Sequence, residues 1–274
     1  MPRPLSFLKK LPVFLFVYFN LNFAHAQIYN SSVSAATAGT GRASVEPNDV
    51  IFLNSATLPH LQGRFFYTSF AKDEFVASLS DNTKESMIPG GLAYVQKKST
   101  SSLGDLKQKD IAVALGEFFA QKWSMGITGH YLEQSVPTAS WHQSNADLGF
   151  LFTPAQNVGL GLVVYNIFGE NSSIPKEFRE KTTVGGGLNY IYRDSIRFRF
   201  DATSESLFAA GIETYLNRFF ITRFGYSDET DDQRQLLTFG VGFNGPRFQI
   251  NYAYQGNPQK SSDYRHSIDL VIPF

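Results

Sequence analysis

The sequence contains no cysteine, and only 18% of its 274 residues are charged. Without cysteine the chain has no disulfide scaffold, no thiolate zinc site and no cysteine nucleophile. The 24 Lys and Arg residues balance the 24 Asp and Glu residues, so the formal net charge is 0. A chain without excess positive charge lacks the bulk electrostatic attraction that drives binding to nucleic acid. We therefore expect no nucleic-acid partner.

The first 26 residues are typical of a secretory signal peptide. Arg3, Lys9 and Lys10 give a basic start, residues 11–19 form an apolar run, and residues 24–26 read Ala-His-Ala, a small-x-small cleavage site. The apolar run is shorter than the roughly 20 residues that a membrane-spanning helix needs. We predict cleavage after Ala26 and export of the remaining chain.

Apolar and polar residues alternate along most of the exported chain, and no segment shows a sustained helical period. In 248–255, for example, Phe248, Ile250, Tyr252 and Tyr254 alternate with polar or small residues. Fourteen such segments are found near 64–71, 74–81, 87–98, 109–119, 123–134, 143–153, 158–168, 180–191, 195–203, 206–215, 219–227, 234–244, 247–255 and 265–274. Many have about ten residues, the length of a tilted membrane-crossing strand. The pattern predicts an all-β, transmembrane antiparallel β-barrel of 14 strands, or 12 without the weak first hairpin.

The connections favour the same fold. Long polar connections are predicted at 99–108, 135–142, 169–179, 228–233 and 256–264, and from the third segment onward they alternate with short turns, except at 204–205. Outer-membrane barrels have long loops outside and short turns in the periplasm. The alternative is a secreted soluble β-sandwich or barrel, in which the apolar face would form an ordinary core.

Aromatic residues, 15% of the chain, gather at the predicted strand ends, as in the interfacial girdles of membrane barrels. Near the long loops these are Tyr131, Trp141, Tyr165, Phe168 and Tyr226. The chain ends on Phe274, which resembles the C-terminal signal of bacterial outer-membrane proteins. That resemblance implies the barrel-assembly machinery as a partner, and outer-membrane lipid and lipopolysaccharide as surroundings.

If the apolar face meets lipid, the charges of the strands point into the lumen. These inward residues are Asp147, Arg197, Arg199, Asp201, Glu213, Arg223 and Asp269. One interpretation is a network of ion pairs that stiffens the wall, and the other is a gate or a polar ligand site. Glycines on the same face leave room for water, a ligand or the N-terminal part of the chain itself.

Residues 28–61 do not alternate, and they resemble the N-terminal hatch of the long-chain fatty-acid outer-membrane transporter family, whose wider group includes PorV-like barrels. Gly41-Arg42-Ala43, an acidic turn with Asp49, and Asn54-Ser55-Ala56-Thr57-Leu58 stand where the family has Gly-x-Ala, an Asp-rich turn and Asn-Pro-Ala-Gly-Leu. Ser55 and Thr57 depart from that pattern. The close match covers about 30 residues.

The resemblance implies a barrel at 63–274, plugged by a hatch at 27–62, that passes small apolar molecules across the outer membrane. It makes Gly41, Asp49, Asn54, Ala56 and Leu58 candidate ligand or gate residues. In transporting members the substrate leaves sideways through a kink in the third strand. Here Pro89-Gly90-Gly91 opens that strand, either as such an exit or as an ordinary strand start. PorV-like relatives imply the alternative of a structural or secretion-associated scaffold.

A third hypothesis is an esterase, because residues 142–146 resemble the His-x-Ser-Asn-Ala motif of outer-membrane lipid A deacylases. His142 and Ser144 share a face of one strand, but the acid that would orient the imidazole is unplaced, and Glu133 in the preceding strand is the only close carboxylate on either neighbour. Those enzymes are small eight-stranded barrels, however, so we predict no catalytic role. His60, His130 and His266 are isolated in the sequence, so we also expect no metal site and no cofactor.

Overall fold

The computed structural model describes residues 29–230 and 233–274, so the predicted signal peptide lies outside the described residues. The strands are β1 (Gly63–Ala71), β2 (Glu74–Asn82), β3 (Gly90–Ser101), β4 (Gly104–Ala120), β5 (Trp123–Val136), β6 (Ala139–Ala155), β7 (Val158–Tyr165), β8 (Thr183–Tyr192), β9 (Ile196–Thr203), β10 (Leu207–Tyr215), β11 (Phe220–Glu229), β12 (Arg234–Asn244), β13 (Gln249–Asn257) and β14 (Lys260–Pro273). Three short helices complete the described part: α1 (Ser32–Ala36), and the 3-10 helices η1 (Ser55–His60) and η2 (Lys176–Phe178). None of these helices has the length and apolar character needed to cross a membrane.

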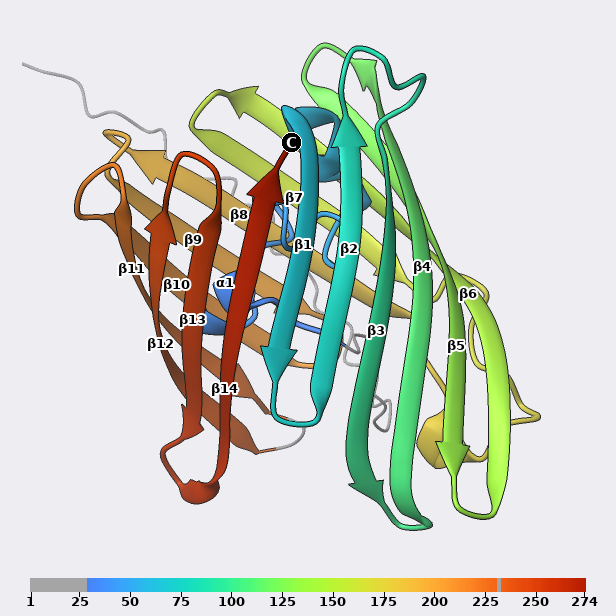
Figure 1. The fold of residues 1–274 in the computed structure, drawn as a ribbon. Helices are drawn as coiled ribbons and strands as arrows, with labels where there is room; N and C mark the ends of the chain where they lie inside the picture. The colour runs from blue at the N-terminus through green and yellow to red at the C-terminus, as the bar shows by residue number, and fades with distance from the viewer. Residues whose placement is uncertain (1–28, 231–232) are drawn as a thin grey trace, which may run out of the picture.

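The strands form one closed antiparallel barrel, in which β1 pairs with β14 (Figure 1). The first hairpin is regular, with Gly63 opposite Asn82 and Ala71 opposite Glu74. The barrel therefore has 14 strands rather than 12, as the alternation predicted. Closure matters because a sheet edge exposes unpaired N–H and C=O groups, which a hydrocarbon environment cannot satisfy.

Side chains alternate between the two faces of the wall. On β4, Asp110, Ala112 and Ala114 are buried inside, whereas Ile111 and Val113 between them are 46% and 51% exposed. Similar apolar side chains are exposed on the other strands, so the barrel has an apolar outer surface and a buried inner one. This is the arrangement of a barrel surrounded by lipid.

We call the end where β1 begins and β14 stops the terminal end, and the opposite end the loop end. Aromatic rings gather at the terminal end, where Trp123 stacks on Phe152 with ring centroids 4.3 Å apart. At the loop end, two residues predicted for the girdle lie elsewhere. Tyr165 is buried inside the barrel, and Trp141 packs against Phe178 of the loop at 166–182.

Several predicted long loops are in fact strand. Residues 99–108 and 135–142 extend the β3–β4 and β5–β6 hairpins, whose turns have only two residues each, and 256–264 extends β13 and β14. These extensions carry polar residues on both faces and only a few apolar ones, because a strand that leaves the membrane loses the alternation by which strands were recognised. The longest connection between strands is 166–182, which joins β7 to β8. It rests on the extended hairpins through an apolar cluster of Leu106, Val136, Ile174 and Phe178.

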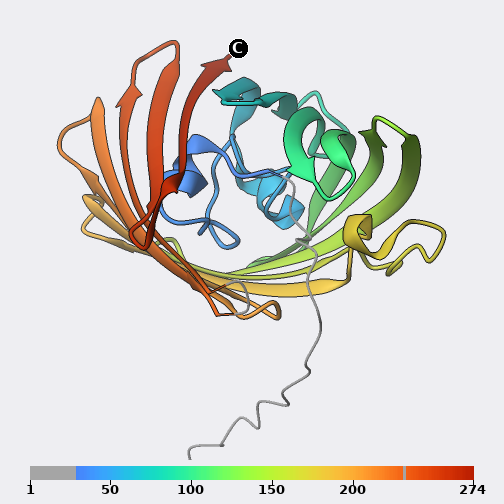
Figure 2. The same cartoon turned by 90° about the horizontal axis from the view of Figure 1, so that it is seen from below.

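Residues 29–62, which we call the inner segment, run through the inside of the barrel (Figure 2). Helix α1 lies against β11–β14, and η1 lies against β4–β6 and β2. Inward-facing glycines make this fit possible. A Cβ atom on Gly126 or Gly161 would collide with the backbone of Ser55 or Arg42, respectively.

Replacement of Gly161 by Ala should destabilise the barrel by about 1–3 kcal/mol, because the added methyl group overpacks the contact with the inner segment. Gly186 on the neighbouring strand is the matched control, since a Cβ there would lie 3.8 Å from its nearest neighbour, the Gly161 carbonyl oxygen. Urea unfolding in lipid vesicles, followed by tryptophan fluorescence, measures both variants. Equal stability of Gly161→Ala and Gly186→Ala would contradict the close approach of the inner segment.

Candidate functional site in the lumen

The charges predicted to face the lumen meet in one buried cluster on β9, β10 and β11. The Glu213 carboxylate pairs with Arg223 at 2.5 Å, with Arg197 at 3.2 Å and with Arg199 at 3.4 Å. All four side chains are largely buried. One carboxylate thus faces three guanidinium groups, and the wall alone leaves positive charge in excess.

Glu46 of the inner segment supplies part of the missing negative charge. Its carboxylate pairs with Arg197 and, at 2.9 Å, with Arg199. The predicted network of wall charges is therefore present, but it joins the wall to the inner segment rather than only strand to strand. Glu46 was not predicted as part of this network, because nothing in a non-alternating segment shows which way a side chain points.

Asp201 on β9 holds the turn that carries the first family-like motif. Its Oδ2 accepts hydrogen bonds from the backbone N–H groups of Gly41 and Arg42 and from Arg42 Nη1, each at 3.0 Å. Gly41 has a φ of +147°, and a Cβ there would lie 2.7 Å from Leu53 Cδ1. The turn therefore requires glycine for its backbone conformation and for its close packing.

Asp269 on β14 forms a similar anchor at the start of the inner segment. It accepts hydrogen bonds from the Ser32 backbone N–H at 2.7 Å, from the Ser32 hydroxyl at 2.6 Å and from Asn48 Nδ2 at 3.1 Å. The neighbouring Asp49 is buried, and its carbonyl oxygen accepts from Leu53 N–H at 2.8 Å. Burial raises the pKa of Asp49 to about 7.

The second motif fixes η1 to the wall. Asn54 Oδ1 accepts from Ala56 N–H at 3.0 Å, and Asn54 Nδ2 donates to the carbonyl oxygens of Arg42 at 2.7 Å and Phe150 at 3.2 Å. Ala56 is fully buried beside Ala43 and Leu151, and Leu58 is buried in the apolar cluster at the inner wall. These motif residues position the inner segment.

The wall is closed at Pro89-Gly90-Gly91. Gly90 and Gly91 pair without interruption with Asp81 and Ser80 on one side, and the Pro89 carbonyl accepts from Gly116 N–H at 3.0 Å. A Cβ on Gly91 would lie 2.6 Å from Ile51 Cδ1, so the inner segment packs directly behind this point. The structure describes an ordinary strand start here, and a lateral exit stays a prediction.

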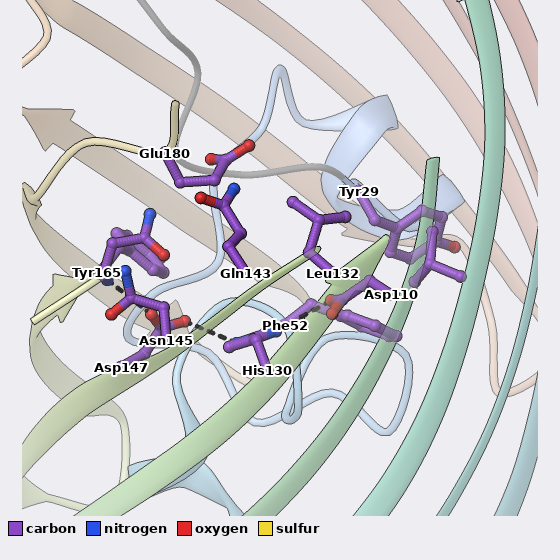
Figure 3. A pocket seen from close by; sticks show the side chains of 12 residues that line it. Tyr29, Phe52, Asp110, His130, Leu132, Gln143, Asn145, Asp147, Tyr165 and Glu180 are labelled. Atoms are coloured by element: carbon purple, nitrogen blue, oxygen red, sulfur yellow. Dashed lines mark hydrogen bonds and ion pairs between the residues drawn. The ribbon is translucent and has the colours of Figure 1, made fainter. Parts of the chain in front are cut away.

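A pocket of about 530 Å³, including open solvent, lies between the inner segment, the loop-end halves of β3–β7 and the loop at 166–182 (Figure 3). It is lined by Tyr29, Phe52, Val95, Asp110, His130, Leu132, Gln143, Asn145, Asp147, Tyr165, Asn166 and Glu180. None of the predicted ligand or gate residues is among them. Of the predicted inward charges, only Asp147 lines the pocket.

His130 links two carboxylates across three strands of this pocket. Its Nδ1 lies 2.9 Å from Asp110 Oδ2 on β4, and its Nε2 lies 3.0 Å from Asp147 Oδ2 on β6. An imidazolium satisfies both contacts with its two N–H donors. His130 is isolated in the sequence but not in the fold, because its partners are distant in sequence and become diagonal neighbours only through the strand register. The common inward parity of the three residues was the available signal.

The loop at 166–182 closes one side of the pocket. Asn166 N–H donates to Asp147 Oδ1 at 2.8 Å, and the Tyr165 hydroxyl donates to the Leu53 carbonyl at 2.7 Å. Glu180 is buried at the far end of the loop. Burial, and then the charge of Asp110, raise the pKa of Glu180 to about 8.

His142 and Ser144 both lie on the exposed outer face of β6. His142 Nδ1 shares a hydrogen bond with the Tyr131 hydroxyl at 3.2 Å, and the two rings stack. Glu133 binds Lys109 at 3.3 Å instead. Within the described residues, His142 forms no hydrogen bond with Ser144 or Glu133, so the catalytic arrangement suggested by the motif does not form.

The barrel is similar to solved transporter structures. The P. putida toluene transporter TodX matches with a TM-score of 0.71 and 10% identity, over 89% of this chain and 98% of that one. The Ralstonia pickettii toluene transporter TbuX matches with 0.68 and 14%, over 89% and 97%, and a Pseudomonas aeruginosa FadL homologue with 0.67 and 11%, over 89% and 98%. The chain has the fold of these transporter barrels. At such identities the likeness concerns the fold alone. No family model and no curated protein sequence matches the chain.

Glu213→Gln should be strongly destabilising, by about 3–5 kcal/mol, because it removes the buried carboxylate that three guanidinium groups share. Glu229→Gln is the control, since within the described residues the ion pair of Glu229 is a long one, at 3.8 Å, with the partly exposed Arg234. Urea unfolding in vesicles compares the two variants. A loss no larger than that of the control would show that the cluster does not hold the wall together.

Proposed function

We propose that the chain is an outer-membrane barrel that binds small apolar molecules at its loop end and passes them across the membrane. The observation that carries this proposal is the pocket with aromatic and aliphatic walls, which lies inside a barrel with an apolar outer surface. Barrels of the same fold include a monoaromatic hydrocarbon channel, CymD, and the two toluene transporters.

In this proposal the loop end faces the outside and residues 27–62 act as the plug, in a mature chain that begins after Ala26. The buried contacts of residues 29–61 with the wall support the assignment. The apolar outer surface would contact membrane lipid and lipopolysaccharide, and the strand that ends at Phe274 would be read by the barrel-assembly machinery. A lateral exit at 89–91 would require Ile51 to move away from Gly91.

The esterase alternative has no geometric support, because His142 is paired with Tyr131 rather than with Ser144 or an acid. The presence of a lumen pocket favours ligand passage over the scaffold alternative, which needs no internal cavity.

Replacement of Leu132 by Trp should reduce uptake of a small aromatic hydrocarbon several-fold, because Leu132 lines the pocket and a larger ring would fill it. The matched control is Tyr131→Trp on the same strand, where the side chain points outward and is 48% exposed. Uptake of radiolabelled toluene by cells that produce each barrel gives the readout, and heat-modifiable migration on a gel shows that each variant is folded. Equal uptake through the two folded variants would exclude the pocket from the route.

Deletion of residues 41–58 should open a pore that conducts ions in a planar bilayer, because it removes most of the segment that fills the lumen. The full-length barrel should remain closed under the same conditions. A deletion variant that folds and yet conducts no more than the full-length barrel would contradict the role of the inner segment as a plug.

A further inference from the structure

Three buried polar atoms of the pocket residues have no hydrogen-bond partner among residues 29–230 and 233–274. They are Asp110 Oδ1, Glu180 Oε2 and Gln143 Nε2. Their residues are only 4%, 8% and 7% exposed, respectively. Most buried polar groups in proteins are paired, and an unpaired one is costly. Two of the three atoms belong to carboxylates, so the pocket offers acceptors for a ligand that donates hydrogen bonds.

The charge of the lining is negative. Asp110 and Asp147 share the single imidazole of His130, and Glu180 adds a third carboxyl group, whose Oε2 has no hydrogen-bond partner in the described part of the chain. Lys97 on β3 interacts electrostatically with Glu180, but it is shared with Glu74 and lies outside the lining. An anionic ligand would therefore be repelled, and a cationic ligand would be attracted.

Rings and aliphatic side chains form the rest of the wall. Tyr29 and Phe52 of the inner segment meet at 4.8 Å between ring centroids, and Val95 and Leu132 lie beside them. Asn145 is a polar lining residue that is already paired, because its Oδ1 accepts from Phe168 N–H at 3.0 Å and its Nδ2 donates to the Gly169 carbonyl at 3.3 Å. The pocket thus combines an apolar surface for an aromatic body with acidic acceptors that are not yet used.

Resting on the function proposed above, we infer that the pocket selects aromatic molecules that carry a protonated amine. The ring packs against Phe52 and Leu132, and the ammonium group donates to Asp110 and Glu180. The raised pKa of Glu180 is consistent with this inference, since it reflects a buried carboxyl group among other carboxylates. A bound ammonium would favour the ionised form and pair with it.

Calorimetric titration of the purified full-length barrel tests the inference with three probes of similar size. They are phenethylamine as the cation, 2-phenylethanol as the neutral analogue and phenylacetate as the anion, each at pH 8. We expect phenethylamine to bind about tenfold or more tightly than the alcohol, and phenylacetate to bind weakest. Ammonium chloride, which has the charge without the ring, should bind far more weakly than phenethylamine.

Glu180→Gln should reduce the preference for phenethylamine over 2-phenylethanol about tenfold, while binding of the alcohol stays nearly unchanged. The matched control is Glu177→Gln on the same loop, because Glu177 is exposed and binds Ser102 at the surface. The control should keep the full preference.

The outcomes separate this inference from the proposed function. Equal binding of the amine and the alcohol would overturn the inference and leave an apolar-molecule site in place. Failure of all three aromatic probes to bind would count against the proposed function as well. Ammonium binding as tight as that of phenethylamine would overturn the inference, because the pocket would then be a simple cation site. An unchanged preference for the amine in Glu180→Gln would also overturn it, because other groups would then provide the charge selectivity.

Discussion

The structure depends on the need to pair charges that the strands place inside the barrel. Asp201, Asp269 and the three guanidinium groups around Glu213 are buried, where an unpaired charge is strongly destabilising. The wall cannot pair them all by itself. The inner segment supplies what is missing, with backbone N–H groups for the two aspartates and the Glu46 carboxylate for two arginines. The same contacts that stabilise the wall therefore fix the inner segment in the lumen.

This arrangement also determines where space remains. Helix α1 and η1 fill the lumen beside β11–β14 and β4–β6, with glycines on the wall that allow backbone to meet backbone. At the loop end, by contrast, the inner segment presents the rings of Tyr29 and Phe52, and the β3–β6 hairpins continue beyond them. The pocket forms in that gap, closed on one side by the loop at 166–182.

The alternation of the sequence predicted the barrel and its 14 strands because a wall between lipid and lumen imposes a period of two on every strand. It failed where that constraint ends, as at residues 99–108, which are strand with polar residues on both faces. The inward charges were predicted by parity, and Arg199 and Glu213 do meet. Their pairing with Glu46, and the contact of His130 with Asp110 and Asp147, depend on register and on the path of a non-periodic segment, which the sequence does not encode locally.

A disulfide cross-link tests most directly whether the wall holds the inner segment inside the barrel. The sequence has no cysteine, so no native thiol can compete with an introduced pair of cysteines for disulfide formation. The hydroxyl oxygens of Ser32 and Ser267 are 2.8 Å apart, and the account predicts that Ser32→Cys combined with Ser267→Cys oxidises to a disulfide in the folded barrel. Ser32→Cys with Ile268→Cys, whose side chain points outward, should keep both thiols free. Two free thiols in the first pair, in a folded barrel under oxidising conditions, would contradict the account.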